Sequence, residues 1–353
     1  MRLQKLRSLL SKKGVEALLI FKLQNIQYLS NFSGSTALML VTMTDSFLLV
    51  DSRYLEQAKC EVKSSNIKLV TISFFDELKL ILDELNLKSV GFESEHLTYD
   101  KFINLAKCLS DFELVPLRHF VEAIRAIKDK SEIEKISKAA HISDLVFNQI
   151  IDFIKPGLAE VEIAAEIEYL MRKSGAEKAS FDTIVASGSN SAAPHAKPTE
   201  RKLKVNDLVK IDFGATYKGY CSDMTRTIFL GRPDKEREKI YNLLLSAQKA
   251  ALSGITKGMS AEKLDGMARK IIFDAGYSEN FGHNLGHGVG LEVHEHPTIG
   301  PNCDDLLEAG MVFTIEPGIY LENFGGFRIE DLVVLHDDGL EILTKSSKEL
   351  TVL

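Results

Sequence analysis

The pattern of apolar and polar positions in the first third of the chain predicts alternating helices and strands. Leucines recur at helical spacing over residues 3–12, and the apolar run at 15–21 predicts a buried strand. Residues 36–52 predict two strands around a polar turn, and residues 74–93 predict a helix followed by a strand. Because this alternation continues to about Pro116, it indicates a compact α/β unit of its own.

The rest of the chain shows a different pattern, in which pairs of helices precede groups of strands. Residues 120–157 predict a connecting segment and a long helix, and residues 158–176 predict a second helix. Strands and hairpins begin at Phe181, interrupted by helical stretches at 235–253 and 260–275. Two helices followed by strands, twice over, favour a pseudo-symmetric α+β domain. The predicted domains are therefore 1–120 and 121–353.

Composition and charge narrow the classes of function. Hydrophobic residues make up 45% of the chain and charged residues 26%, which is typical of a soluble globular protein. The net charge of −7 disfavours a nucleic-acid groove, and no stretch is long enough to span a bilayer. The basic start is interrupted by Glu16 and is followed by no small-residue cleavage site. The four cysteines are scattered, as free thiols in a reducing compartment would be. We expect a cytoplasmic protein without a nucleic-acid or membrane partner.

Acidic residues in the second half of the chain stand within otherwise apolar strands. In the predicted strand LVKIDFG, Lys210 and Asp212 share the face opposite the apolar side chains. Asp223 follows after a turn that could fold the two strands together, and Glu316 and Glu330 occupy later strands. An unpaired buried carboxylate costs several kcal/mol or becomes protonated, so four of them predict a shared cation.

A histidine cluster supplies the remaining ligand type. Residues 282–297 contain four of the nine histidines of the chain. Carboxylates with an imidazole suit Mn²⁺, Co²⁺, Fe²⁺ or Zn²⁺ and disfavour Cu(I) or an iron–sulfur cluster. Four negative charges suit two divalent ions, which together can deprotonate a water and polarise a carbonyl. The pattern indicates metal-assisted hydrolysis but does not by itself say which histidine binds.

Four motifs resemble the pita-bread metallopeptidases, and most closely the Xaa-Pro peptidases, aminopeptidase P and prolidase. They are IDFGATYKGYCSDMTRT at 211–227, HNLGHGVGLEVHEHP at 283–297, TIEPGIY at 314–320 and GGFRIEDLVV at 325–334. The resemblance covers about residues 122–353, and the first 120 or so residues are similar to the creatinase-type N-terminal domain of that family. It implies an α+β pita-bread catalytic domain behind a smaller α/β domain.

The resemblance also implies the ligands of two divalent metal ions, with Mn²⁺ preferred over Co²⁺, Zn²⁺ or Fe²⁺. Asp212 would chelate one ion, and His287 would bind the other. Asp223 and Glu330 would bridge both ions, and Glu316 would complete the second and shuttle a proton.

Further residues match positions near the metals of that family. His195 matches an active-site histidine, and His294 matches one that contacts the substrate carbonyl or its oxyanion. His283 matches a residue of the substrate pocket, and Arg328 one that orients a bridging carboxylate and the substrate. His296 has no such counterpart and is expected at the surface or in a loop.

One position departs from the family pattern. At Lys210 an apolar side chain is expected, so the lysine is predicted either to turn outward or to neutralise nearby acid.

The function implied is hydrolysis of the Xaa-Pro bond at the N-terminus of peptides by a homodimer. The alternative is a prolidase restricted to Xaa-Pro dipeptides, and a more remote one is an inactive binding protein on the same fold. A methionine aminopeptidase lacks the N-terminal domain, and a creatinase-type amidinohydrolase lacks the metal ligands, so both are disfavoured.

Overall fold

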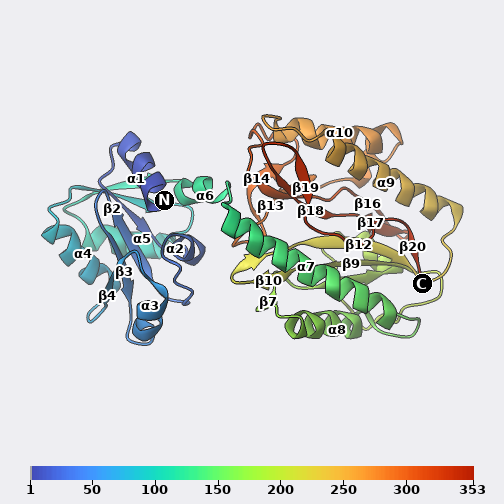
Figure 1. The fold of residues 1–353 in the computed structure, drawn as a ribbon, viewed down its shortest axis with the longest axis horizontal. Helices are drawn as coiled ribbons and strands as arrows, with labels where there is room; N and C mark the ends of the chain where they lie inside the picture. The colour runs from blue at the N-terminus through green and yellow to red at the C-terminus, as the bar shows by residue number, and fades with distance from the viewer. Residues whose placement is uncertain (1) are drawn as a thin grey trace. The chain divides into compact units, whose positions relative to one another are not determined.

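The structure is a computed structural model that describes residues 2–353. The chain divides into two compact units, Met1–Arg125 and Ala126–Leu353. The sequence had predicted a division between residues 120 and 121. The first unit has one sheet and one main hydrophobic core, and the second has several sheets and two main cores (Figure 1).

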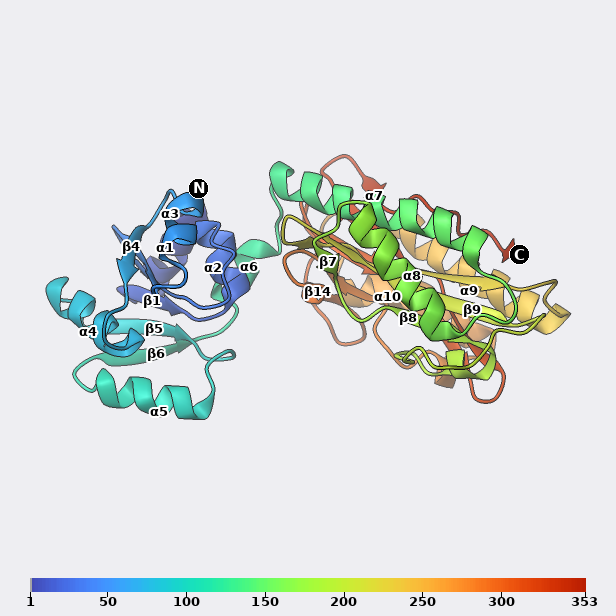
Figure 2. The same ribbon diagram turned by 90° about the horizontal axis from the view of Figure 1, so that it is seen from below.

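The first unit is built on one six-stranded sheet with the order β4-β3-β2-β1-β5-β6. Strand β2 runs antiparallel to β1 and β3, and the other neighbouring pairs are parallel. Helix α5 lies on one side of the sheet, and α1 and α2 lie on the other (Figure 2). The strands are β1 Ala17–Ile20, β2 Leu38–Thr42, β3 Ser46–Val50, β4 Asn66–Leu69, β5 Ser89–Glu93 and β6 Glu113–Leu117. The helices are α1 Arg2–Lys13, α2 Leu23–Ser30, α3 Leu55–Glu61, α4 Phe74–Glu84, α5 Tyr99–Cys108 and α6 Phe120–Arg125.

Period-2 alternation explains how this sheet buries both faces. Leu19 and Leu40 belong to the core that α4 and α5 cover with Leu78 and Leu105. Leu18, on the opposite face of β1, is equally buried. The predicted α/β character of this part of the chain is confirmed.

The second unit contains the same arrangement, a pair of helices packed on a sheet, two times. Helices α7 (Lys130–Phe153) and α8 (Glu160–Lys173) pack on a sheet of order β20-β12-β9-β8. Helices α9 (Lys235–Gly254) and α10 (Ala261–Asp274) pack on a sheet of order β14-β13-β15-β18-β19. Figure 1 shows the strands between the two helix pairs. The predicted pseudo-symmetric α+β domain is confirmed.

The strands of the second unit are short, and two smaller sheets, β11-β10-β7 and β16-β17, complete it. The first half contains β7 Lys178–Ala179, β8 Ile184–Ser187, β9 Leu208–Phe213, β10 Ala215–Tyr217, β11 Tyr220–Cys221 and β12 Met224–Phe229. The second half contains β13 Gly286–Gly288, β14 Glu295–Ile299, β15 Val312–Ile315, β16 Gly318–Leu321, β17 Gly325–Arg328, β18 Asp331–Leu335, β19 Leu340–Ile342 and β20 Thr351–Val352. Two 3₁₀ turns are η1 Gly188–Ala192 and η2 Ser278–Asn280.

Local sequence signals account for the helix boundaries. Asp129 accepts a hydrogen bond from the backbone of Glu132, whose carboxylate accepts one from the Asp129 backbone, so this capping box starts α7. Gly175 follows α8 with φ of +98°, a conformation that glycine adopts without a Cβ penalty. Over residues 2–353, no helix is both long and apolar enough to cross a membrane.

Candidate metal centre

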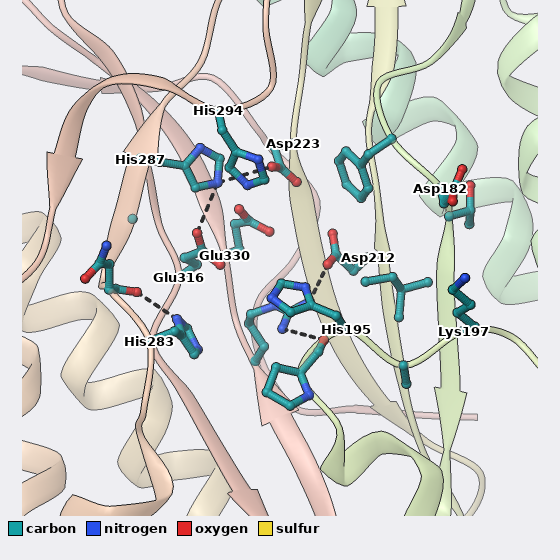
Figure 3. Close-up of a pocket in the computed structure, with 18 of the residues that line it drawn as sticks. Asp182, His195, Lys197, Asp212, Asp223, His283, His287, His294, Glu316 and Glu330 are labelled. Carbon is teal, nitrogen blue, oxygen red and sulfur yellow. Dashed lines mark hydrogen bonds and ion pairs between the residues drawn. The ribbon is translucent and has the colours of Figure 1, made fainter. Parts of the chain in front are cut away.

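Strands from both halves of the second unit bring the predicted metal-binding side chains to one pocket. Asp212 is on β9, and Asp223 directly precedes β12, which pairs antiparallel with β9 so that Thr225 faces Asp212. The turn between these strands therefore brings the two acids together, as the sequence predicted. His287 is on β13, Glu316 follows β15, and Glu330 lies between β17 and β18. All five line a pocket of about 630 Å³ (Figure 3).

His287 is at the centre of this group. Its Nε2 atom lies 3.2 Å from Oε1 of Glu316 and 3.6 Å from Oδ2 of Asp223. Asp223, His287 and Glu330 each offer one ligand atom, and these atoms lie within 4.8 Å of one another. Three of the five predicted ligands thus form a compact cluster, with Glu316 in contact with its histidine.

The charges in the cluster compete with one another. Burial raises the pKa of Asp223 well above its usual value, and the neighbouring Glu330 and Asp212 raise it further. Burial likewise raises the pKa of Glu330, with Glu316 and Asp212 acting in the same direction. For Glu316, burial is outweighed by the hydrogen bond and charge of His287, so its pKa falls to about 2. The same pairing raises the pKa of His287 against the effect of its own burial.

This donor set fits divalent cations. Oδ1 of Asp212 is buried, and no residue of the described chain hydrogen-bonds to it. Crowded carboxylates that raise each other's pKa, together with an oxygen that lacks a partner, are satisfied by positive charge at their centre. Oxygen donors with one imidazole match the preferences of Mn²⁺, Co²⁺, Fe²⁺ and Zn²⁺.

Three of the histidines outside the ligand set, His195, His283 and His294, also line the pocket. The ring of His294 packs edge-on to that of His287, with 4.1 Å between centroids. Partial burial and the neighbouring His287 lower the pKa of His294. His195 is exposed, in the loop that follows η1. His296 lies on β14 with its side chain 39% exposed, and its Nδ1 is 3.7 Å from Asp305.

The hydrogen bonds of His283 favour one neutral tautomer. Nδ1 of His283 is 2.7 Å from the carbonyl oxygen of Asn284, which can only accept, so Nδ1 carries the proton. Nε2 then accepts from the hydroxyl of Tyr320, 3.2 Å away. Burial lowers the pKa of His283, which favours the same neutral form.

Arg328 links several of these groups from a buried position. It donates to Oδ2 of Asp212, to the Tyr320 hydroxyl at 2.7 Å and to Oγ1 of Thr225 at 3.0 Å. Thr225 in turn donates to Glu330 over 2.7 Å. Arg328 therefore contacts one proposed ligand directly and a second through Thr225.

Lys210 does not turn outward, so that alternative was wrong. Its side chain is fully buried, and Nζ donates to the carbonyl oxygens of Ser191, Ala193 and Pro194. Burial and the charge of Arg328 lower its pKa to about 6, whereas three carbonyl acceptors favour the ammonium, the only form with three N–H groups.

Sequence reasoning missed several residues that line the pocket, and it missed Tyr320, which contacts the pocket residues His283 and Arg328. Tyr320 lies within the motif TIEPGIY, but only the pairing of β16 with β17 places its hydroxyl close to Arg328. Burial raises the pKa of Tyr320 to about 12, so its hydroxyl stays protonated. Phe181, Asp182 and Lys197 also line the pocket, and Asp182 and Lys197 lie across it from His287 (Figure 3).

The fold and the cluster of carboxylates around His287 are those of a metal-dependent hydrolase. Residues 134–337 match the model of metallopeptidase family M24, and residues 2–127 match the creatinase/prolidase N-terminal domain. The chain belongs to metallopeptidase family M24, whose members use divalent metal ions.

Named relatives span the whole chain. An Xaa-Pro dipeptidase of Pyrococcus furiosus is 41% identical over 355 residues, covering 99% of each chain. The structure of an Xaa-Pro dipeptidase from Bacillus anthracis is 40% identical, with a TM-score of 0.97 over 100% of this chain and 99% of the other. That of an X-Pro aminopeptidase from Thermotoga maritima is 41% identical, with a TM-score of 0.90 over 96% and 98%.

Proposed function

We propose that this metallopeptidase is an Xaa-Pro dipeptidase that works with two divalent metal ions. The observation that carries the proposal is the meeting of five ligand-type side chains in a pocket that three further histidines line. The names of the relatives from Pyrococcus furiosus and Bacillus anthracis support the substrate class.

Asp212, Asp223, His287, Glu316 and Glu330 would hold the two ions. Mn²⁺ is the preferred ion, because four of the five ligands are carboxylates. When bound, such a pair supplies a water of lowered pKa and polarises the substrate carbonyl.

The side chains of the chain supply positioning and proton transfer. A ring N–H of neutral His294 donates to the oxygen of the carbonyl before proline, and this bond strengthens as that oxygen becomes an oxyanion. The Glu316 carboxylate would take a proton from the attacking water and give it to the departing proline nitrogen. His195 and His283 contact the substrate, and Arg328 orients Asp212 and the substrate.

The sequence alone had favoured an Xaa-Pro aminopeptidase, and the named relatives favour the dipeptidase instead. An Xaa-Pro aminopeptidase remains the second candidate, because the Thermotoga maritima relative carries that name at 41% identity. The two functions share the same metal site and differ in whether a chain continues beyond proline.

A homodimer in the cytoplasm is part of the same proposal, and the four free thiols suit a reducing compartment. Sedimentation that shows only a 39.3 kDa species would contradict the dimer.

The test of the function is hydrolysis by protein stripped with a chelator and then reloaded with Mn²⁺. We expect cleavage of Ala-Pro and no comparable cleavage of Ala-Ala, with two Mn²⁺ bound per chain. Cleavage of both dipeptides at similar rates would contradict the assignment to Xaa-Pro bonds.

A further inference from the structure

The segment that carries His195 is held at its two ends by a buried carboxylate. Glu160 on α8 accepts hydrogen bonds from the backbone and side chain of Ser187 and of Thr199, and from the amide of Asn190. Glu160 is fully buried, so these bonds are shielded from water. Between Asn190 and Thr199, other contacts hold the backbone of this segment.

Lys210 supplies those contacts in the middle of the segment. Its Nζ lies 3.1, 2.7 and 3.1 Å from the carbonyl oxygens of Ser191, Ala193 and Pro194, all within the four residues before His195. The Ala193 carbonyl also accepts from the backbone N–H of Ala196 at 3.3 Å, and that of Pro194 from Arg328, so Lys210 adds a second donor to both.

Arg328 contacts the same segment from a second strand. Its Nη1 donates to the carbonyl oxygen of Pro194 at 3.1 Å, so this oxygen accepts from Lys210 and from Arg328. On the same strand, the backbone N–H of Gly326 donates to Oγ of Ser191 at 2.8 Å. A Cβ at Gly326 would lie 2.0 Å from the Ser191 carbonyl oxygen, so the segment packs directly on β17.

From this convergence we propose that Lys210 is a positioning residue that fixes the 191–194 backbone and so holds His195 in the substrate pocket. The inference rests on the proposed function, in which His195 contacts the substrate. Lys210 stands on β9 two residues before Asp212, so one strand presents both a metal ligand and the anchor of the histidine segment.

The position also explains how a lysine fits where an apolar residue is expected. The aliphatic stem of Lys210 fills the buried site, and Nζ lies 5.0 Å from the centroid of the Tyr320 ring.

A double-mutant cycle tests the proposal, with Lys210→Met, His195→Ala and their combination in the Mn²⁺-loaded protein. Lys210→Met keeps an unbranched side chain and removes the donor. A shift of about 1 Å in a positioned group can cost roughly a hundredfold, so we expect kcat/KM for Ala-Pro to fall roughly ten- to a hundredfold. In the His195→Ala background the same substitution should cost less than about twofold, because the two changes act through one group.

Two further measurements separate this role from a general structural one. Mn²⁺ content should stay unchanged in Lys210→Met, and hydrogen exchange over residues 188–198 should quicken while exchange in α9 does not. The matched control is Lys204→Met, at an exposed lysine in the same part of the chain, which should change none of these quantities.

The proposal would be overturned if the losses in kcat/KM from Lys210→Met and His195→Ala multiplied in the double variant. Loss of Mn²⁺ from Lys210→Met would overturn it as well. If Lys210→Met does not fold, Lys210→Gln carries the same cycle with a shorter donor, and failure of both to fold would assign Lys210 to core stability instead. If the unmodified protein cleaves no Xaa-Pro peptide, the proposed function fails, while the exchange comparison still decides whether Lys210 holds the segment.

Discussion

Nη1 of Arg328 donates a hydrogen bond to the hydroxyl oxygen of Tyr320 over 2.7 Å. Because the hydroxyl accepts from Arg328, its own proton is free to be donated to Nε2 of His283. The same guanidinium contacts Asp212. One phenol therefore connects the proposed metal site to a histidine of the substrate pocket.

Replacing this phenol should impair catalysis without releasing metal. In Tyr320→Phe, Arg328 loses one acceptor and His283 loses the donor to Nε2, while the five proposed ligands stay unchanged. We expect kcat/KM for Ala-Pro to fall about tenfold with Mn²⁺ content unaltered, as measured by elemental analysis beside steady-state kinetics. Loss of Mn²⁺ from Tyr320→Phe would show instead that the hydroxyl supports the metal ligands.

Substitutions of the two adjacent histidines, His287 and His294, should have different effects on metal binding and on turnover. His287→Ala removes a proposed ligand and should lose metal and activity together. His294→Ala should keep two Mn²⁺ while kcat falls roughly a hundredfold, since it removes a donor to the oxyanion. A folded His294→Ala that binds no metal would reverse the two assignments.

Metal removal should lower thermal stability, because the carboxylate cluster then lacks its counter-charge. Free Mn²⁺ at about 100 times its dissociation constant stabilises a folded protein by about 2.7 kcal/mol. Scanning calorimetry with and without Mn²⁺ should therefore show a higher Tm for the loaded protein.

Glu330→Gln is the informative variant for that experiment. It should raise the Tm of the stripped protein, because burial and the nearby Glu316 and Asp212 disfavour the carboxylate of Glu330. Adding Mn²⁺ should raise the Tm of this variant much less than it raises the Tm of the unmodified protein. An unchanged response to Mn²⁺ in this variant would argue against Glu330 as a ligand.

A buried carboxyl of the first unit should make stability depend on pH. Burial raises the pKa of Glu93 from 4.5 to about 7, against the hydrogen bonds from Asn25, Lys22 and Phe21. Because of the raised pKa, the folded state keeps this proton to a higher pH than the unfolded state does. Stability is therefore lost as pH rises from about 4.5 to about 7. The loss amounts to about 3 kcal/mol at most.

Glu93→Gln removes this titration. The free energy of unfolding of the variant should therefore rise relative to the unmodified protein between pH 4.5 and 7, and the difference should be constant above about pH 8. Urea unfolding at a series of pH values measures it. A difference that does not change with pH would mean that Glu93 titrates at its ordinary value in the folded protein.

Period-2 alternation predicted much of this site. It separated Asp212 and Lys210 from Val209, Ile211 and Phe213, and those three apolar side chains lie in the core beneath α7 and α8. Alternation assigns a face, but it does not say what the far end of a long side chain meets. The direction of Lys210 depends on the carbonyls of Ser191 and Ala193, which lie in a segment distant in the chain and have no side-chain signature.

Tyr320 escaped sequence analysis for a related reason. An aromatic residue in a strand is most often part of a core, and only the pairing of β16 with β17 places this hydroxyl beside Arg328. Contacts that depend on how two hairpins meet are set by tertiary packing, and the pattern of one strand does not contain them.

The central claim is that this metal centre cleaves Xaa-Pro dipeptides, and one comparison tests it most directly. Protein stripped of metal and reloaded with Mn²⁺ would be assayed on Ala-Pro beside Ala-Pro-Ala. We predict cleavage of Ala-Pro, with a kcat/KM well above that for Ala-Pro-Ala. Equal or faster cleavage of the tripeptide would contradict the dipeptidase assignment and indicate an Xaa-Pro aminopeptidase, and cleavage of neither peptide with two Mn²⁺ bound would contradict the Xaa-Pro function itself.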